Sequence, residues 1–452
     1  MNFLIKTFGC QMNVNDSEIM SGLLTQAGYL WTENPEDADI VLINSCAVRE
    51  KAENKMYGTI GQFLKIKKSR KLIIGVGGCS AEKEGKAILE RFDGVDFVFG
   101  TRNISDIVTL IQRAQKHKRF VDLSDKLDCV SHELPKNPTS RHHAWITIIY
   151  GCNKYCTYCI VPYTRGLEKS RPYEDIINEV YDYAAKGYRE ITFLGQNVDS
   201  YGKDFSDGKP KLDLLIKKAS EIEEIKRVWF LTSYPTDITD SLIDEIAASR
   251  NAARNVHLPV QAGSDSILKS MNRRYTRQQF IDLVKKVKDK IPSVTISSDI
   301  IVGFPGETEE DFQQTVSLIK ECRFERVNLA EYSPRQGTIA YKYKPDNIAH
   351  EEKNRRLMYL MELQKEINRE ENEKYRDKLL RIIPEAKASD TALYGRTMNN
   401  KIVIFNSQDA SLIGKFADIK IKRITAGPLY GEMTKNENDA GFDIQNDPTF
   451  MI

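Results

Sequence analysis

The sequence predicts an α/β protein in three parts: an N-terminal parallel α/β domain, a partial (β/α)6 barrel and a small C-terminal all-β barrel. Three observations lead to this prediction. Short β-rich runs alternate with helical segments in two separate series, with an unpatterned stretch between them. Such alternation is typical of parallel sheets. From about residue 379 onward the chain changes to short β runs separated by turns that contain glycine.

The first part is predicted to span residues 1–118. Its β runs lie at 3–9, 39–45, 71–78 and 97–100. Apolar spacing predicts helices over 14–29, 49–68 and 105–115. The next stretch has no hydrophobic period and contains two prolines, so we predict a linker over 119–140.

The second part is predicted to span residues 141–372. Its strand candidates are 144–150, 190–195, 227–233, 255–260, 295–304 and 326–332. Six β/α units are fewer than the eight of a closed TIM barrel, so the barrel is expected to be partial. The part ends in a long charged helix that begins near residue 350.

The third part is predicted over residues 373–435. Its five β runs, at 379–383, 392–397, 401–405, 416–424 and 428–433, favour a small barrel. Between Tyr375 and Met433 there are ten Lys or Arg against six Asp or Glu, so this segment is locally basic. The polar residues 436–452 are predicted to form a loose tail.

Composition narrows the function classes. The chain has 452 residues, 41% hydrophobic, with a net charge of +2, which excludes a polybasic protein and favours a globular one. No apolar run approaches the roughly 20 residues that span a bilayer. The N-terminus lacks the features of a signal peptide, so a cytoplasmic protein without membrane association is predicted. Eight cysteines in that compartment favour metal or redox chemistry over disulfides.

One cysteine group is C-x3-C-x2-C, directly after the predicted strand 144–150. Its members are Cys152, Cys156 and Cys159. Three thiolates on one loop can ligate three irons of a [4Fe–4S] cluster and leave the fourth open. Zinc is the competing interpretation, but structural zinc sites fill four positions, and no fourth cysteine or histidine follows nearby. Three unrelated core cysteines are the remaining alternative.

A second group consists of Cys10, Cys46 and Cys79, each just after a predicted strand. Their spacings of 36 and 33 residues are each about one βα repeat. Because the carboxyl ends of parallel strands share one sheet edge, these cysteines are expected to converge into a second three-thiolate site. Three small buried core residues are the alternative.

The segments TFGCQMNVNDSE, NSCAVREKAENK and GCNKYCTYCIVPYTRGLEKSRP carry a resemblance that covers residues 1 to about 435. The chain resembles the methylthiotransferase family of radical S-adenosylmethionine (SAM) enzymes. In that family a three-cysteine domain precedes a radical SAM barrel and a TRAM domain, an OB-like RNA-binding barrel. The segments look most like the branch that modifies isopentenyladenosine next to the tRNA anticodon.

The resemblance implies conversion of N6-isopentenyladenosine at position 37 of tRNA to its 2-methylthio derivative. It implies two [4Fe–4S] clusters and two SAM molecules, one for methylating a sulfur and one for radical C–H activation. The auxiliary cluster would supply the sulfur. The alternatives are a sister enzyme acting on threonylcarbamoyl-adenosine or on a ribosomal-protein aspartate, and, more remotely, a non-catalytic iron–sulfur RNA-binding protein.

Further site residues follow from the resemblance and from positions near strand carboxyl ends. The residues expected to contact SAM are Tyr158, Gly195, Gln196, Asn197, Ser233, Gln261, Asp299 and Gly303. The residues expected to contact RNA are Lys401, Lys420, Lys422 and Arg423. Near the cysteine loop, Lys154, Arg165 and Arg171 are expected to meet phosphate, a cofactor carboxylate or a neighbouring acid. The expected partners are the tRNA anticodon stem-loop and an electron donor such as flavodoxin, and the chain is expected to be monomeric.

Overall fold

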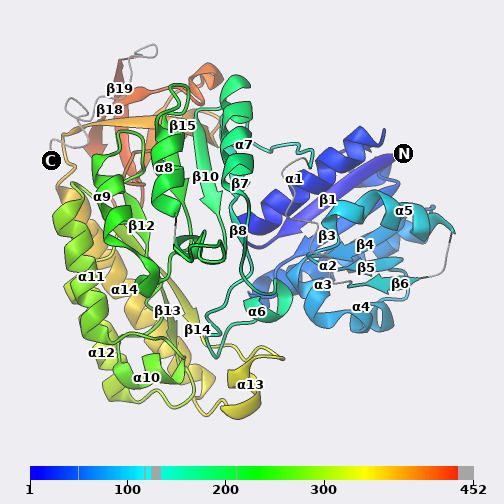
Figure 1. The fold of residues 1–452 in the computed structure, drawn as a ribbon, viewed down its shortest axis with the longest axis horizontal. Helices are drawn as coiled ribbons and strands as arrows, with labels where there is room; N and C mark the ends of the chain where they lie inside the picture. Colours follow the sequence, from blue (N-terminus) through cyan, green and yellow to red (C-terminus); the bar gives the residue numbers. More distant parts are fainter. Residues whose placement is uncertain (49, 117–118, 124–133, 210, 436–452) are drawn as a thin grey trace.

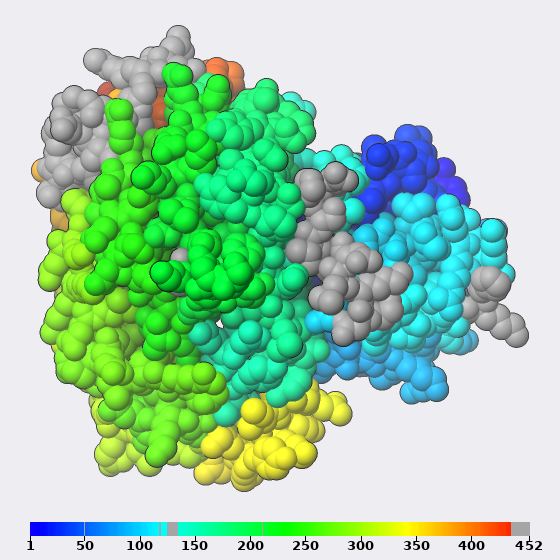
Figure 2. All heavy atoms as spheres, viewed as in Figure 1, coloured from blue at the N-terminus to red at the C-terminus, as the bar shows by residue number. Residues whose placement is uncertain are grey.

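The computed structural model describes residues 1–48, 50–116, 119–123, 134–209 and 211–435. Figure 1 shows an N-terminal sheet domain, a larger barrel and a small β-barrel at one end of that larger barrel. In Figure 2 the N-terminal domain forms a lobe beside the body of the molecule. The predicted tail, 436–452, lies outside the described residues, as does much of the predicted linker.

The N-terminal sheet has six parallel strands in the order β2-β1-β3-β4-β5-β6. These are β1 (Asn2–Phe8), β2 (Leu30–Trp31), β3 (Ile40–Ser45), β4 (Ile73–Gly77), β5 (Phe97–Phe99) and β6 (Phe120–Asp122). The helices are α1 (Gln11–Gln26), α2 (Glu50–Lys67), α3 (Cys79–Glu84), α4 (Lys86–Arg91) and α5 (Ile107–Lys116). Strand β6 corrects the predicted domain limit, because it pairs with β5 although it lies inside the range predicted as linker.

The two faces of this sheet are covered by different helices. Apolar residues of α1 and α5 pack with Phe3, Ile40 and Leu42 on one face. Residues of α2, α3 and α4 pack with Leu4 and Val41 on the other face. Because neighbouring strand residues point to opposite faces, a strand covered on both sides must be apolar throughout, as β3 nearly is.

The barrel contains six parallel strands in two groups of three, β7-β10-β11 and β12-β13-β14. A parallel bridge from Val228 to Ala252 joins the groups. The strands are β7 (His143–Thr147), β10 (Glu190–Leu194), β11 (Arg227–Phe230), β12 (Asn255–His257), β13 (Thr295–Val302) and β14 (Arg326–Glu331). Among the described strands β7 and β14 do not pair with each other, so the barrel is open, as predicted.

Helices surround this barrel and share one apolar core with its strands. They are α7 (Tyr173–Ala185), α8 (Leu212–Ser220), α9 (Asp240–Ala248), α10 (Asp265–Ser270), α11 (Arg277–Lys290), α12 (Glu309–Cys322) and α14 (His350–Glu373). The loops at the carboxyl ends carry smaller elements: the ribbon of β8 (Ile149–Tyr150) and β9 (Lys169–Ser170), and the short helices α6 (Val161–Thr164) and α13 (Ile339–Tyr343).

The C-terminal domain is a closed five-stranded barrel in the order β15-β16-β17-β19-β18. Its strands are β15 (Leu379–Ser389), β16 (Ala392–Arg396), β17 (Ile402–Asn406), β18 (Ala417–Arg423) and β19 (Leu429–Lys435). The β16–β17 turn packs against the amino ends of the large barrel. Arg227 donates to the carbonyl oxygens of Arg396 and Thr397, and the Arg254 amide donates to that of Met398. The small barrel is therefore fixed opposite the carboxyl ends of the strands.

In the described part of the chain no helix is long and apolar enough to cross a membrane.

Candidate functional site

The cysteine group Cys10, Cys46 and Cys79 lies at the carboxyl ends of the adjacent strands β1, β3 and β4. Cys10 immediately precedes α1, and Cys79 is the first residue of α3. A hydrogen bond between the Cys10 and Cys46 thiols lowers the pKa of Cys10 and raises that of Cys46. The structure therefore brings together three cysteines that are distant in sequence.

Two glycines allow this close approach. At Gly78, φ is +87°, and a Cβ atom would lie 2.3 Å from Asn44 Oδ1. At Gly9, φ is +139°, and a Cβ atom would lie 2.5 Å from the Cβ of Cys46. Asn44 is itself held by a reciprocal contact, because Asn13 Nδ2 donates to its Oδ1 at 3.0 Å and its own Nδ2 donates to the Asn13 carbonyl at 2.9 Å. Only glycine fits at both points.

The other cysteine group, Cys152, Cys156 and Cys159, lies on the loop after β8. The Cys152 amide donates to the Gly166 carbonyl at 3.1 Å, and the Cys159 amide donates to the Cys156 carbonyl at 2.9 Å. Burial raises the pKa of Cys152 and that of Cys159 to about 12. Thiols buried in this way become thiolates readily only when a positive group such as iron compensates the charge.

The two cysteine groups are neighbours in space. Arg165, six residues after Cys159, donates from Nε to Cys79 Sγ at 3.3 Å and from Nη2 to Asp16 at 2.6 Å. Ile160 packs in one buried cluster with Ala47 and Cys79. The segment around α6 therefore belongs to both sites, and Figure 1 shows α6 between α3 and the barrel.

Within the described residues no group of three or more His, Cys, Asp or Glu side chains is drawn together tightly enough to hold a single metal ion. A cubane cluster does not require such convergence, because each of its cysteines binds a different iron.

Several predicted SAM contacts follow β10. Gln196 Oε1 and Asn197 Oδ1 are buried and have no hydrogen-bond partner within the described structure. Asn197 Nδ2 donates to Asp237 at 2.7 Å, which fixes the orientation of the amide. At Gly195 a Cβ atom would lie 2.4 Å from Ile149, so this glycine lets the β10 loop approach β8, the strand that precedes the cysteine loop. Buried polar atoms without a partner are uncommon in native proteins, and a bound ligand, ion or water is one way in which their hydrogen bonding is completed.

The remaining predicted SAM residues are placed less uniformly. Tyr158 is partly buried against the core of the large barrel. Ser233 donates to Asp199 at 3.1 Å. Asp299 accepts from Asn328 Nδ2 at 2.8 Å. The amide of Gly303 donates to Glu307 at 2.6 Å, and Gln261 adopts a left-handed φ of +76°. The contacts of these residues with SAM stay predictions.

Among the basic residues, the prediction for Lys401 is wrong, whereas the three near the cysteine loop meet one of their expected partners, a neighbouring acid. Lys401 is not a surface residue: only 3% of its side chain is exposed, and Nζ is ion-paired with Glu325. Lys401 lies in the β16–β17 turn, immediately before β17, so its ion pair with Glu325 joins the small barrel to the large one. Near the cysteine loop each cation meets a neighbouring acid: Lys154 pairs with Asp237, Arg165 with Asp16 and Arg171 with Glu179.

Sequence reasoning missed Arg273. This residue is 7% exposed, and its Nη1 donates to Cys156 Sγ at 3.4 Å. Nε donates to the Tyr275 hydroxyl at 2.9 Å, and the guanidinium lies 4.3 Å from the centre of the Tyr234 ring. The only sequence signal is a basic pair in NRRYT, which is indistinguishable from a solvated turn.

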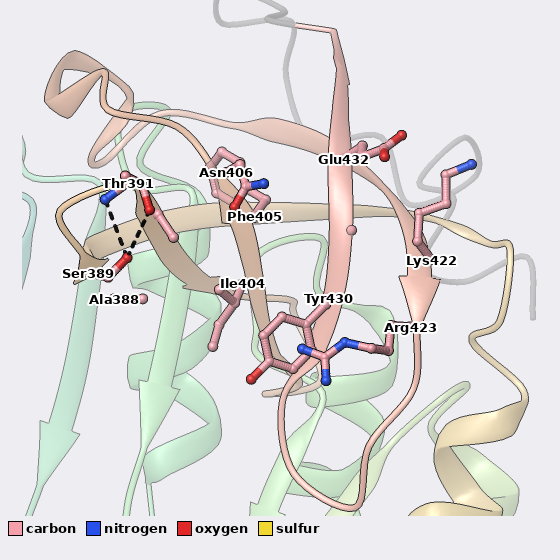
Figure 3. A pocket seen from close by; sticks show the side chains of 12 residues that line it. Ala388, Ser389, Thr391, Ile404, Phe405, Asn406, Lys422, Arg423, Tyr430 and Glu432 are labelled. Carbon is pink, nitrogen blue, oxygen red and sulfur yellow. Dashed lines mark hydrogen bonds between the residues drawn. The ribbon is translucent and has the colours of Figure 1, made fainter.

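The small barrel carries a groove of about 570 Å³, shown in Figure 3. Its lining includes Lys422, Arg423, Tyr430, Ile404 and Asn406. The Arg423 guanidinium lies 3.6 Å from the centre of the Tyr430 ring, a cation–π distance. Lys420, also on β18, is partly exposed, and it does not line the groove.

Comparison with known proteins divides the chain in the same order. Residues 2–100 match the uncharacterized protein family UPF0004, residues 146–319 the radical SAM superfamily and residues 373–434 the TRAM domain. The tRNA-2-methylthio-N(6)-dimethylallyladenosine synthase of Petrotoga mobilis is 66% identical over 438 residues, covering 96% of this chain and 100% of that protein. The protein of the same name from Thermotoga petrophila is 56% identical over 433 residues, 96% and 97% of the two chains.

The chain belongs to this family of synthases.

Solved structures agree on the fold. The radical SAM methyltransferase TsrM from Kitasatospora setae superposes with a TM-score of 0.53 at 12% identity, covering 73% of this chain and 72% of that one. The cobalamin-dependent SAM radical enzyme OxsB gives a TM-score of 0.52 at 13% identity, covering 80% and 56%. At such identities the likeness concerns the fold alone. The predicted three-part architecture of this synthase family member is confirmed by the family matches and by the strand order.

Proposed function

We propose that this chain methylthiolates carbon 2 of N6-isopentenyladenosine at position 37 of tRNA. The observation that carries the proposal is the pair of cysteine groups joined by Arg165, in a chain 66% identical to a synthase of this name. A reaction at an unactivated C–H bond needs both a hydrogen abstractor and a sulfur source. Two neighbouring three-cysteine sites supply a place for each.

The residues present fit two [4Fe–4S] clusters, the cofactors of this family together with SAM. Cys152, Cys156 and Cys159 would hold one cluster, and Cys10, Cys46 and Cys79 the other. Each set offers three soft thiolate ligands, so each leaves one iron without a protein cysteine. The oxygens of Gln196 and Asn197 are hydrogen-bond acceptors that receive no hydrogen bond from the described residues. They therefore fit the ammonium group of SAM, which is a donor.

When bound, these groups supply a carbon radical that can abstract hydrogen and a sulfur that can be transferred. The chain contributes position, charge and exclusion of water. Ile160 and Ala47 form an apolar contact between the two sites. Asp237, paired with Lys154 and Lys203, holds the Asn197 amide so that its oxygen stays free for a ligand. No side chain needs to move a proton from carbon 2, because that hydrogen is not acidic.

The RNA partner is assigned to two surfaces. Lys422 and Arg423, beside Tyr430, give the groove of the small barrel positive charge and a ring for stacking, which are the elements of single-strand binding. Lys420, on the same strand, would add charge outside the groove. Tyr155 and Tyr163, 36% and 48% exposed, lie with ring centres 6.3 Å apart beside the cysteine loop. Exposed rings there suit bases splayed out of the anticodon loop.

Several finer points belong to the same proposal. The external electron donor is a flavodoxin-type protein, the enzyme acts as a monomer, and it works in the cytoplasm, where tRNA is found. The domain limits are those predicted, except that the first sheet continues through Asp122.

The deciding experiment is mass spectrometry of tRNA nucleosides from cells that lack this protein and from cells that carry it. We expect 2-methylthio-N6-isopentenyladenosine to disappear and N6-isopentenyladenosine to accumulate without it. An unchanged amount of the methylthio nucleoside would refute the substrate. Altered threonylcarbamoyl-adenosine would then point to the sister tRNA enzyme.

A further inference from the structure

Each cysteine group has one buried arginine that donates to one of its sulfurs. Arg273 donates to Cys156 at 3.4 Å, and Arg165 donates to Cys79 at 3.3 Å. The side chains are 7% and 5% exposed, so neither charge is solvated by bulk water. Burying a guanidinium is costly unless an anion compensates it.

The two arginines differ in their compensating groups. Arg165 has a carboxylate, Asp16, at 2.6 Å, and that ion pair is almost fully buried. Arg273 meets the Tyr275 hydroxyl, the Pro259 carbonyl and the faces of the Tyr234 and Tyr275 rings. Among the described residues no carboxylate forms an ion pair with Arg273. Its counter-charge therefore has to come from the Cys156 side.

This difference matters for electron transfer. Adding one electron to a thiolate-ligated cluster makes the site more negative by one unit, with no proton moved and no bond broken at that stage. A nearby uncompensated positive charge stabilises the more negative state, and hydrogen bonds to the sulfurs act in the same direction. A cation whose charge is already neutralised by a carboxylate stabilises the reduced cluster far less.

We propose that Arg273 is a positioning residue that makes the Cys152–Cys156–Cys159 site the easier of the two to reduce, while the Arg165–Asp16 pair withholds this bias from the Cys10–Cys46–Cys79 site. The electron, supplied by an external low-potential one-electron donor, is thereby directed to the site that cleaves SAM. The site that holds the transferable sulfur stays oxidised. This inference rests on the proposed function, since both cysteine groups must hold clusters.

The test is a redox titration of full-length, iron-reconstituted protein without SAM, followed by electron paramagnetic resonance. Two parent proteins isolate the sites: one has Cys10, Cys46 and Cys79 replaced by Ala, and the other has Cys152, Cys156 and Cys159 replaced by Ala. In the first parent, Arg273→Gln is expected to lower the reduced-to-oxidised ratio at a fixed potential at least tenfold, which is 59 mV for a one-electron couple. Arg273→Lys keeps the charge and is expected to change the ratio less than threefold.

In the second parent, Asp16→Asn removes the carboxylate and leaves Arg165 uncompensated. The reduced-to-oxidised ratio at a fixed potential is expected to rise at least tenfold. Arg254→Gln is the matched control: Arg254 is also buried, but it donates to carbonyl oxygens near α9 rather than to a thiol. This control is expected to leave both ratios unchanged.

A ratio within threefold of the parent in Arg273→Gln with iron content intact would overturn the proposal. So would equal effects of Gln and Lys at position 273, since packing alone would then explain the change. If Arg273→Gln fails to retain iron, the Asp16→Asn titration decides, and no shift there refutes the charge argument. Mass spectrometry of tRNA nucleosides from cells that carry or lack the unmutated protein tests the proposed function separately.

Discussion

Replacing Lys401 with Met tests whether this residue joins the two barrels or contacts RNA. Its side chain is 3% exposed, and Nζ meets the Glu325 carboxylate and Asn372 Oδ1, the latter at 2.6 Å. The change leaves a carboxylate and an amide oxygen without their donor. Met matches the length of the lysine stem, so the packing of the turn is largely kept.

The expected cost follows from the burial of the pair. Breaking a buried ion pair by removing one partner costs roughly 3–5 kcal/mol, and because Glu325 keeps 20% of its side-chain exposure we expect about 3 kcal/mol. Burial raises the pKa of Glu325 and lowers that of Lys401, so desolvation outweighs their attraction. The double variant Lys401→Met with Glu325→Gln should therefore recover to within about 1 kcal/mol of the parent.

Two measurements check this reasoning. Urea unfolding followed by tryptophan fluorescence reports on the junction, because the Trp229 ring lies 5.6 Å from the Arg396 guanidinium. Salt-dependent tRNA binding reports on phosphate contacts. Lys422→Ala, at an exposed position, should reduce the slope of log K for tRNA binding against log salt concentration by about 0.7, the value for one phosphate contact with a single strand, and change stability by less than about 0.5 kcal/mol. If Lys401→Met instead reduced the slope by about 0.7 and left stability unchanged, the interdomain assignment would be refuted.

Three further predictions concern the sites themselves. Replacing Cys152, Cys156 or Cys159 with Ala should abolish formation of deoxyadenosine. Replacing Cys10, Cys46 or Cys79 with Ala should leave SAM cleavage intact and stop sulfur insertion. Full methylthio product from a variant of the second set would contradict the two-site scheme. Gly78→Ala should lose about half of the bound iron, because its Cβ would collide with Asn44, whereas Gly28→Ala, at a similar φ of +85° with open space around it, should keep all of it. Burial raises the pKa of Asp199 to about 7, so the folded state binds an extra proton and stability should fall as pH rises from 4 to 7. Asp199→Asn should flatten this dependence, which is on the order of 4 kcal/mol, in urea titrations across that range; an unchanged slope would contradict it.

The convergence of the cysteines illustrates what spacing alone can predict. Cys10, Cys46 and Cys79 each follow a strand, and the rule that parallel strands share a carboxyl edge places them together without any side-chain detail. The C-x3-C-x2-C loop is local, so its spacing already constrains the three thiols. The prediction that Lys401 contacts RNA was wrong because the position of this residue depends on tertiary packing and not on local spacing. A lysine in a basic segment is usually solvated, and only the docking of the β16–β17 turn onto the large barrel buries it.

The sequence by itself determined the order of the three domains, the six strands of the large barrel, four of the six strands of the N-terminal sheet, the cysteine groups and the chemistry that thiolates at those positions support. These features depend on periodicity and spacing within short stretches of chain. Only the tertiary structure decided which charges meet which sulfurs. Arg165 and Asp16 are 149 residues apart in the sequence, and Arg273 and Cys156 are 117 residues apart. Many other pairs at the same separations do not touch. Such contacts arise when separate elements pack, and local sequence does not encode which element will lie opposite.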